Sequence, residues 1–196
     1  GPRSMGKSSL LNALSRQLKL HHPDSRVVLA PLFDDSLRVI ESEQPEIVTS
    51  SPEALHQTVM AHPAAHLIFL VDETDLFIAK DAEQEYAWTN VMRALSSQGK
   101  ASFVLAGHQA LHNAASAADH PLRNFGHVLR LGPLDLDAAK QMILDPFSAL
   151  DLQFAEESRT VSWICEQTGC RPHLLARLCV AIVERCQTMG SSVISF

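Results

Sequence analysis

The chain has 196 residues, 46% of them hydrophobic, and a formal net charge of -6 at pH 7. These values fit one compact domain with a small appended subdomain, and the negative charge argues against a general affinity for nucleic acids. No apolar run reaches transmembrane length and no signal-peptide pattern is recognised, so we expect no membrane partner.

The first eight residues, GPRSMGKS, match the G-x-x-x-x-G-K-S pattern of a phosphate-binding P-loop, or Walker A motif. Gly1 and Gly6 let the backbone curl so that successive N–H groups face the phosphates. Lys7 is expected to reach the β- and γ-phosphates of a nucleoside triphosphate, and the Ser8 hydroxyl to bind Mg²⁺. The residues expected to line the nucleotide here are Gly1, Pro2, Arg3, Ser4, Met5, Gly6, Lys7, Ser8 and Ser9. We assign no role to the side chains of Arg3 and Met5.

A helix is expected directly after this loop, from Ser8 to Leu20. Leu10, Leu14 and Leu18 recur at four-residue spacing and form one buried stripe. The helix start is where phosphates bind, because unpaired N–H groups and a partial positive charge meet there. This favours a P-loop over a glycine turn that binds nothing. A P-loop normally follows a buried strand that this sequence does not contain, so we expect the chain to be part of a larger protein.

The next elements are a strand and a helix. Ser25 to Phe33 (SRVVLAPLF) predicts a strand, and Pro31 places it at a sheet edge because proline cannot donate a ladder hydrogen bond. The polar residues that follow predict a loop or a broken helix. Ser51 as N-cap and Pro52 at the first helical position then begin a helix that runs to about Ala61.

A carboxylate pair follows a second apolar strand. Residues His66 to Val71 (HLIFLV) form the continuous apolar run of a central parallel strand covered by helices. Asp72 and Glu73 come next, at the end where open α/β sheets bind ligands. We interpret them as a Walker B element rather than an ordinary acidic turn. Asp72 would hold Mg²⁺, and Glu73 would orient or deprotonate the attacking water.

The remaining elements of the first part alternate between helix and strand. Glu83 to Ser97 predicts a helix, in which Trp88 belongs to the core rather than to a base-stacking platform. Ser102 to Ala106 predicts another apolar strand, and His127 to Leu131 predicts a more polar strand suited to a sheet edge.

After Pro133 the pattern changes to helices only. The first expected helix begins at Asp135 or Asp137 and ends or kinks at Pro146. The second begins at Glu157 and ends at Gly169. The third begins at Pro172 and ends near Gly190. Strands that alternate with helices and are then followed by helices alone predict an α/β core over residues 1–133 and an α-helical subdomain over residues 134–196.

Neither the cysteines nor the histidines form a known metal pattern. The cysteines are Cys165, Cys170, Cys179 and Cys186. They lack C-x-x-C spacing, so we interpret them as buried free thiols of a cytoplasmic protein rather than as a zinc site. His62 with His66, and His108 with His112, have the spacing of two ligands on one helix face but lack an added Glu or Cys, so we expect no metal there.

Several segments together carry a resemblance to a known family. They are the P-loop, Val71-Asp72-Glu73, Met92-Arg93-Ala94-Leu95, the runs 103–107, 121–125 and 131–134, and the run Thr168-Gly169-Cys170-Arg171-Pro172-His173-Leu174-Leu175. In this order they resemble the STAND-type ATPases, signalling relatives of the AAA+ group that are also similar to origin-recognition and helicase-loader ATPases. The resemblance covers nearly the whole chain, and G-x-R-P-x-L-L is its most specific part.

The resemblance implies a P-loop NTPase three-layer sandwich. Its parallel sheet would have the order 5-1-4-3-2, with the first strand missing from this chain, and an α-helical lid would follow. It also implies ATP rather than GTP, and no guanine-reading N-K-x-D pattern occurs. A further module, often a winged helix in this family, would follow the last residues, Ser191 to Phe196.

The resemblance also implies roles for residues outside the Walker motifs. Gly107 and His108 fall where the family's nucleotide sensor follows the fourth strand, although that sensor is usually Ser, Thr, Asn or Arg. Arg171 and Pro172 match the lid motif that contacts nucleotide. Arg123 is a candidate for an arginine that stabilises transition-state charge, supplied to a neighbouring subunit, or else an ordinary surface arginine.

We therefore expect Mg-ATP binding and hydrolysis used as a conformational switch in a larger multidomain signalling or defence protein, with a homo-oligomer or flanking domains as partners. The expected catalytic residues are Glu73, Lys7 and Arg123. The alternative is a DNA-associated AAA+ ATPase of loader or transposition type, which would contact DNA through a module outside this chain. A degenerate scaffold without turnover is disfavoured by the intact Walker residues.

Overall fold

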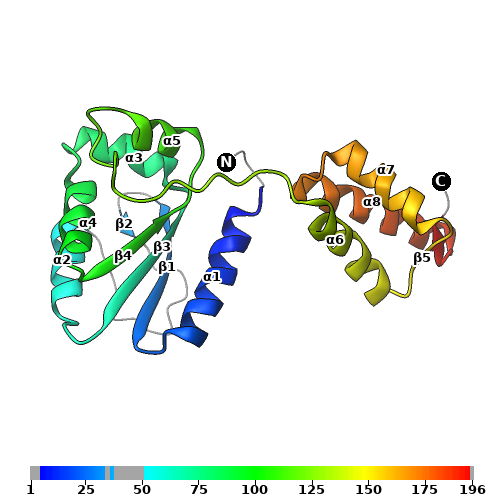
Figure 1. Cartoon of the computed structure of the whole chain (residues 1–196), viewed down its shortest axis with the longest axis horizontal. Helices are drawn as coiled ribbons and strands as arrows, with labels where there is room; N and C mark the ends of the chain where they lie inside the picture. The colour runs from blue at the N-terminus through cyan, green and yellow to red at the C-terminus, as the bar shows by residue number, and fades with distance from the viewer. Residues whose placement is uncertain (1–4, 34–35, 38–50, 195–196) are drawn as a thin grey trace. The chain divides into compact units, whose positions relative to one another are not determined.

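The computed structural model describes residues 5–33, 36–37 and 51–194, and the side chains of residues 5–29 and 51–194. The chain divides into two compact units, Lys7–Arg130 and Leu131–Phe196. The first is a parallel sheet with helices, and the second is helical (Figure 1). No helix of the described residues is long and apolar enough to cross a membrane.

Three parallel strands form the sheet of the first unit. They are β1 (Ser25–Phe33), β3 (His66–Asp72) and β4 (Ala101–Leu105), and β2 (Ser36–Leu37) adds a short antiparallel pair at the end of β1. The sheet order is β2-β1-β3-β4. In this register Pro31 of β1 lies opposite Asp72 of β3. Over Ser25 to Pro31, β1 pairs with β3 alone among the described residues, which agrees with the edge position expected from the proline.

Five helices accompany this sheet. They are α1 (Lys7–His21), α2 (Pro52–Met60), α3 (Thr74–Glu83), α4 (Ala87–Ser97) and α5 (Gln109–Ser116). The first packs on β1 and β3, whereas α4 packs on β4 and against α2. Figure 1 shows α1 on one face of the sheet and α2 and α4 on the other. The first unit is therefore an α/β sandwich, as the sequence predicted.

The buried core of this unit is centred on β3. Leu67, Phe69, Leu70 and Val71 are all nearly inaccessible to solvent, and the Phe69 ring stacks on Phe103 of β4 with centroids 5.1 Å apart. A strand covered on both faces is apolar at consecutive positions, so the predicted central strand is confirmed.

Local sequence signals also explain the helix boundaries. The Ser51 hydroxyl accepts a hydrogen bond from Ala54 N at 3.1 Å, and Pro52 occupies the first turn of α2, as expected of a capped helix start. Trp88 is buried and meets the edge of Phe77 at a centroid distance of 6.2 Å. The prediction that Trp88 belongs to the core is confirmed.

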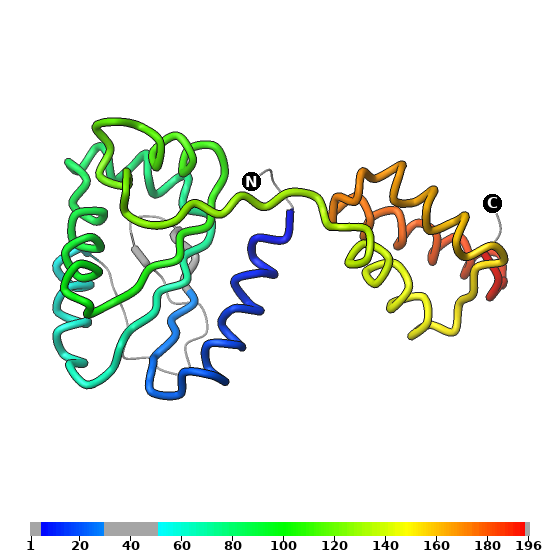
Figure 2. The backbone as a smooth tube through the Cα atoms, in the orientation of Figure 1, coloured from blue at the N-terminus to red at the C-terminus, as the bar shows by residue number. Residues whose placement is uncertain are grey.

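The expected helix from Glu83 to Ser97 has different bounds. A separate helix, α3, already ends at Glu83, and the chain then reverses before α4 begins at Ala87 (Figure 2). Glu85 and Tyr86 adopt left-handed φ values of 53° and 60° in this turn. Helical periodicity does not reveal such a break, because the buried residues of both helices belong to the same apolar cluster.

The predicted strand from His127 to Leu131 is wrong. These residues form neither helix nor strand, and Val128 and Leu129 are exposed. The physical reason is a missing ladder partner. In the described residues no strand lies beside this segment, so its backbone has no partner for a ladder. The observed order β1-β3-β4 matches the 2-3-4 portion of the expected sheet, and the described residues leave the full five-strand order unconfirmed.

The second unit consists of three helices and a short sheet. The helices are α6 (Leu136–Ala149), α7 (Glu157–Thr168) and α8 (Pro172–Met189), and β5 (Gln153–Phe154) pairs in parallel with β6 (Val193–Ile194). The N-cap of α6 is Asp135, whose carboxylate accepts a hydrogen bond from Ala138 N at 2.7 Å. The helix continues past Pro146 to Ala149, so of the two expected effects Pro146 does not end the helix, and a kink there stays a prediction.

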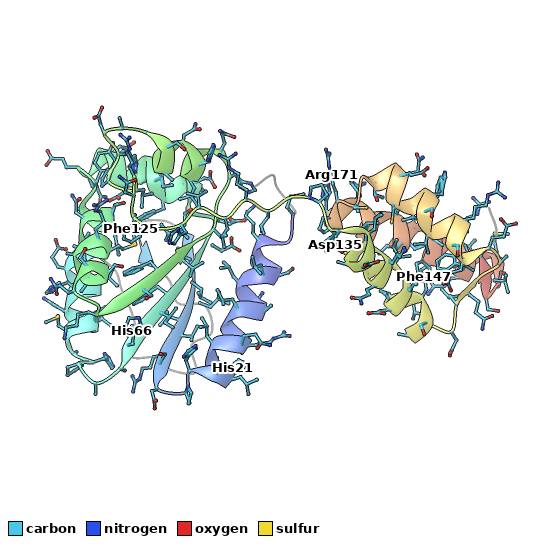
Figure 3. The ribbon with its side chains drawn as sticks, viewed as in Figure 1. His21, His66, Phe125, Asp135, Phe147 and Arg171 are labelled. Atoms are coloured by element: carbon cyan, nitrogen blue, oxygen red, sulfur yellow. The ribbon has the colours of Figure 1, made fainter. Side chains whose placement is uncertain are left out.

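A separate apolar core holds the second unit together. Phe147, labelled in Figure 3, is buried, and its ring meets the edge of Phe154 at a centroid distance of 4.8 Å. Ile143, Ile164 and Leu175 bring the three helices into the same cluster. The short β5–β6 pair carried no sequence signal, because two-residue strands are too short to show an alternating pattern.

Candidate nucleotide site

Three segments that are far apart in sequence meet at the carboxyl end of β3. They are the first turn of α1, the turn from β3 into α3 and the loop after β4. The Ser8 hydroxyl donates a hydrogen bond to Asp72 Oδ2, and Glu73 N donates one to Asp72 Oδ1 at 2.9 Å. Both carboxylate oxygens of Asp72 are therefore held by neighbours. The structure brings together the two residues that the sequence predicted as metal ligands.

The Ser8–Asp72 pair fits a hard divalent cation. A hydroxyl oxygen and a carboxylate are the ligand types that Mg²⁺ prefers, and Mg²⁺ usually takes one or two protein ligands together with water and phosphate oxygens. When Ser8 donates its hydrogen to Asp72, the lone pairs of its hydroxyl oxygen remain available. The described residues contain no group of three or more His, Cys, Asp and Glu side chains that could hold a metal ion. The ligand roles of Ser8 and Asp72 stay predictions.

Lys7 lies next to His108. Its Nζ is 3.1 Å from His108 Nδ1 and 3.4 Å from His108 Nε2. Because an ammonium group has only donors, the ring nitrogen that it meets accepts the hydrogen bond through a lone pair. The first turn of α1 is thereby joined to the loop after β4 across a sequence separation of 101 residues.

The surroundings of Lys7 suit an ammonium group that binds an anion. Burial lowers the pKa of the Lys7 ammonium group, and three carboxylates that follow β3 oppose this shift. They belong to Asp72, Asp75 and Glu73. A bound phosphate would add further negative charge beside the ammonium group and favour its protonated form.

Glu73 has a strained backbone. It is exposed and adopts φ 52° and ψ 41°, the left-handed conformation, immediately before α3. In a residue other than glycine this costs on the order of 1–3 kcal/mol, and such strain clusters at functional sites. The next residue explains how the turn is maintained. Thr74 is buried, and both its N (3.0 Å) and its hydroxyl (3.2 Å) donate hydrogen bonds to Ala106 O.

The loop after β4 approaches this turn so closely that only glycine fits at position 107. A Cβ atom there would lie 2.7 Å from Thr74 Oγ1, 2.9 Å from Asp75 Oδ2 and 2.9 Å from Leu111 Cβ. On the other side of the loop start, Ala106 N donates a hydrogen bond to Val71 O at 2.7 Å. Gly107 is therefore required by close approach, and it allows His108 to lie beside Lys7.

Asp75 is a site residue that the sequence analysis missed. Its Oδ2 accepts a hydrogen bond from His108 N at 2.6 Å, and its Oδ1 accepts one from Ala110 N at 2.8 Å. The available signal was a third acidic residue in the run Asp72-Glu73-Thr74-Asp75. Helix α5 was itself not predicted.

The P-loop is described only in part. Residues Gly1, Pro2, Arg3 and Ser4 lie outside the described residues. Gly6 has a left-handed φ of 84°, which agrees with the expectation that glycine permits the curled backbone. Ser9 is exposed in the first turn of α1. The roles of all these residues in nucleotide binding stay predictions.

Arg123 lies apart from these contacts. It is exposed in the loop that follows α5, and its guanidinium donates a hydrogen bond to Ala118 O at 3.3 Å. The Arg93 guanidinium of α4 donates to the carbonyl oxygens of Pro121 and, at 3.1 Å, of Arg123. In the described structure the hydrogen bonds of Arg123 stay within its own region, so both interpretations of this arginine remain open.

Arg171 and Pro172 belong to the second unit and begin α8 (Figure 3). The preceding Gly169 and Cys170 both have left-handed φ values, 55° and 53°. Cys170 N donates a hydrogen bond to Cys165 O at 3.2 Å and closes the end of α7. A left-handed φ is the conformation that glycine adopts most readily, and here Cys170 adopts it.

The histidines of the first pair, His62 and His66, contact two different partners. His62 Nδ1 lies 2.8 Å from Thr58 O, and His66 Nε2 lies 2.9 Å from Ser102 Oγ. The four cysteines are free thiols. Cys165, Cys179 and Cys186 are buried, as expected, whereas Cys170 is half-buried.

Comparison with known proteins gives a likeness of fold. No protein-family model matches the sequence, and no curated relative was found. Among solved structures, the chain is similar to domain III of the replication initiation protein DnaA from Thermotoga maritima, with a TM-score of 0.62 and 17% sequence identity over 97% of this chain and 75% of that chain. The chain thus has an α/β fold similar to that of this domain.

Proposed function

We propose that this chain binds Mg-ATP and hydrolyses it, and that the nucleotide state acts as a conformational switch in a larger multidomain signalling or defence protein. The observation that carries the proposal is the hydrogen bond from the Ser8 hydroxyl to Asp72 at the end of β3, with Lys7 beside it. A P-loop helix start and a strand-end carboxylate in contact are what a triphosphate with a cation requires.

Each residue has a defined task in this proposal. Lys7 binds the β- and γ-phosphate oxygens as a point charge, and Ser8 and Asp72 hold Mg²⁺, which when bound would neutralise charge on the phosphates. Glu73 orients the attacking water or accepts its proton. The exposed position of Glu73 beside Asp72 supports this assignment, because its carboxylate acts electrostatically on Lys7 together with that of Asp72.

The proposed switch also involves residues outside the Walker motifs. Residues 134–196, which form the second unit, are proposed to be a lid. In this lid, Arg171 and Pro172 contact the nucleotide. Arg123 is proposed to stabilise transition-state charge in a neighbouring copy, with homo-oligomerisation or movement of flanking domains as the output. ATP rather than GTP is proposed from the resemblance of the sequence motifs.

The test is nucleotide binding and single-turnover hydrolysis for three forms of the protein. Lys7→Ala should abolish tight ATP binding, because it removes the positive charge that meets the phosphates. Glu73→Gln should bind ATP and lose hydrolysis by about 100-fold or more, because the amide cannot accept a proton. Lys19→Ala in α1 and Glu83→Gln in α3, both exposed, are matched controls that should behave as wild type. Hydrolysis by Glu73→Gln at the wild-type rate would refute the assignment of Glu73.

A second candidate is a DNA-associated ATPase. It is favoured by the likeness of fold to a domain of a replication initiation protein, whereas the net charge of -6 weighs against DNA contacts by this chain itself. Duplex DNA should then stimulate ATP hydrolysis, and the stimulation should disappear at raised salt. Hydrolysis that is unaffected by DNA at low salt would favour the signalling switch.

A further inference from the structure

The start of α5 is capped in an unusual way. The N-cap residue of a helix is normally Ser, Thr, Asp or Asn, whose own side chain accepts a hydrogen bond from the first turn. Here the N-cap is His108, and its side chain makes no capping hydrogen bond. The acceptor comes instead from another helix, because Asp75 of α3 binds the amides of His108 and Ala110 at 2.6 and 2.8 Å.

This arrangement leaves the His108 imidazole available to Lys7. A serine or aspartate at position 108 would turn its side chain back to the helix start, whereas the histidine ring extends to Lys7 Nζ at 3.1 Å. Charge-assisted hydrogen bonds from two amides to one carboxylate hold the backbone of the loop firmly. The close approach of Gly107 to Asp75 and Thr74 leaves that loop no room to shift toward α3.

We propose that Asp75 is a positioning residue for nucleotide discrimination, which holds His108 against Lys7 so that the loop after β4 distinguishes a nucleoside triphosphate from a diphosphate. This inference depends on the proposed function. Phosphate oxygens compete with the His108 ring for the hydrogen atoms of the Lys7 ammonium group. A ring nitrogen that carries a proton can in turn donate to a γ-phosphate oxygen, which a diphosphate does not offer.

The same contacts connect His108 to helices α3 and α5 of the first unit. Asp75 lies in the first turn of α3, two residues after Glu73, and it binds the first turn of α5. A shift of the His108 ring is therefore linked through its own backbone amide to the helix that follows Asp72 and Glu73. Helices α3 and α5 also pack on each other along their length.

The experiment compares the dissociation constants of ATP and ADP, and their ratio, for wild type, Asp75→Asn, His108→Ala and the double variant. Each single variant should lower the preference for ATP over ADP by about tenfold. The double variant should lower it no further, since both changes remove the same contact. Asp81→Asn is the matched control, because Asp81 also lies on α3 and accepts backbone amides from the start of another helix, α4, but is buried in the core; it should lower stability and leave the ratio unchanged.

A second measurement is independent of nucleotide. The amide proton signals of His108 and Ala110 in NMR spectra should move upfield in Asp75→Asn and stay in place in Asp81→Asn, because hydrogen bonds to a carboxylate shift amide protons downfield. All affinities are measured at a temperature where circular dichroism shows each variant to be folded. If Asp75→Asn does not fold, His108→Ala alone decides the matter, since its side chain caps no helix.

The outcomes separate this inference from the proposed function. An unchanged ATP to ADP ratio in Asp75→Asn or in His108→Ala would overturn the inference alone, as would additive losses in the double variant. Wild-type protein that binds neither ATP nor ADP would overturn the proposed function and the inference with it. A ratio that falls equally in Asp81→Asn would show that Asp75 acts through general stability, which also overturns the positioning role.

Discussion

The two ends of α3 use the same device for different purposes. At its first turn, Asp75 accepts hydrogen bonds from His108 N and Ala110 N at the start of α5. Near its last turn, Asp81 accepts hydrogen bonds from Trp88 N at 2.9 Å and Thr89 N at 3.1 Å at the start of α4. In both cases a carboxylate from one helix caps another. Asp81 is 2% exposed, whereas Asp75 is partly exposed beside Lys7.

The difference lies in what each cap leaves available. The buried Asp81 carboxylate also accepts a hydrogen bond from the Thr89 hydroxyl at 2.5 Å. Its hydrogen bonds therefore fix the turn between α3 and α4. Around Asp75 the capped residue is His108, whose ring faces Lys7. A buried cap of this kind stabilises the fold, and a partly exposed one can hold a functional side chain in place.

The largest expected effect is loss of the buried cap. Asp81→Ala leaves two amides and the Thr89 hydroxyl buried without an acceptor, which should lower the free energy of unfolding by about 3 kcal/mol or more. Urea unfolding followed by Trp88 fluorescence, in a Trp163→Phe background, measures this for the first unit. The change should leave the preference for ATP over ADP intact at temperatures where the protein is folded. A loss below about 1 kcal/mol would contradict the role given to this carboxylate.

An intermediate effect is expected where the loop after β4 meets Asp75. Gly107→Ala places a methyl group 2.7 Å from Thr74 Oγ1 and 2.9 Å from Asp75 Oδ2, so neighbouring atoms must move, at a cost of about 1–3 kcal/mol. Displacement of the loop should also weaken the discrimination between ATP and ADP. Gly126→Ala is the matched control, because a Cβ atom there meets nothing within 4 Å. Equal stability of the two variants would refute the steric argument.

The sequence predicted the first half of the site because motif and topology agree there. The P-loop pattern marks a helix start, the apolar run before Asp72 marks a buried strand, and the end of such a strand is where an open sheet binds ligands. These two local signals were enough to bring Ser8 and Asp72 together in advance. The first helix and the three helices of the second unit were predicted for a similar reason, since their apolar periodicity and terminal residues are local features.

The rest depends on contacts between distant segments. Asp75 and Asp81 cap helices that begin after a loop or a strand, and no spacing rule connects a carboxylate to a helix start on another element. Helix α5 lacks an N-cap signal of its own because Asp75 supplies the acceptor. The strand predicted at His127 to Leu131 had a suitable pattern, but a strand also requires a neighbour for its ladder.

The smallest expected effect is a pH dependence of the stability of the first unit, caused by His120 near the Asp81 end of α3. Burial lowers the pKa of His120, and the Asp81 carboxylate opposes this shift. His120 Nδ1 accepts a hydrogen bond from Leu122 N at 3.1 Å, and its Nε2 is buried without a partner in the described residues. A second proton on the ring would remove the acceptor, so the folded state favours the neutral form.

The sign of this dependence follows from linkage. An unfolded histidine titrates near about pH 6.5, and the folded pKa of His120 lies below its ordinary value, so the unfolded state binds the proton more readily between the two values. The contribution to stability is complete above about pH 6.5 and is lost as the pH falls toward the folded pKa.

The urea midpoint of the first unit should therefore fall between pH 7.5 and pH 5.5 by more in wild type than in His120→Asn. His56→Asn, an exposed histidine of α2, should keep the wild-type dependence. Identical pH dependence in wild type and His120→Asn would mean that groups other than His120 cause the change in stability. The contacts of His120 near Asp81 would then contribute packing alone.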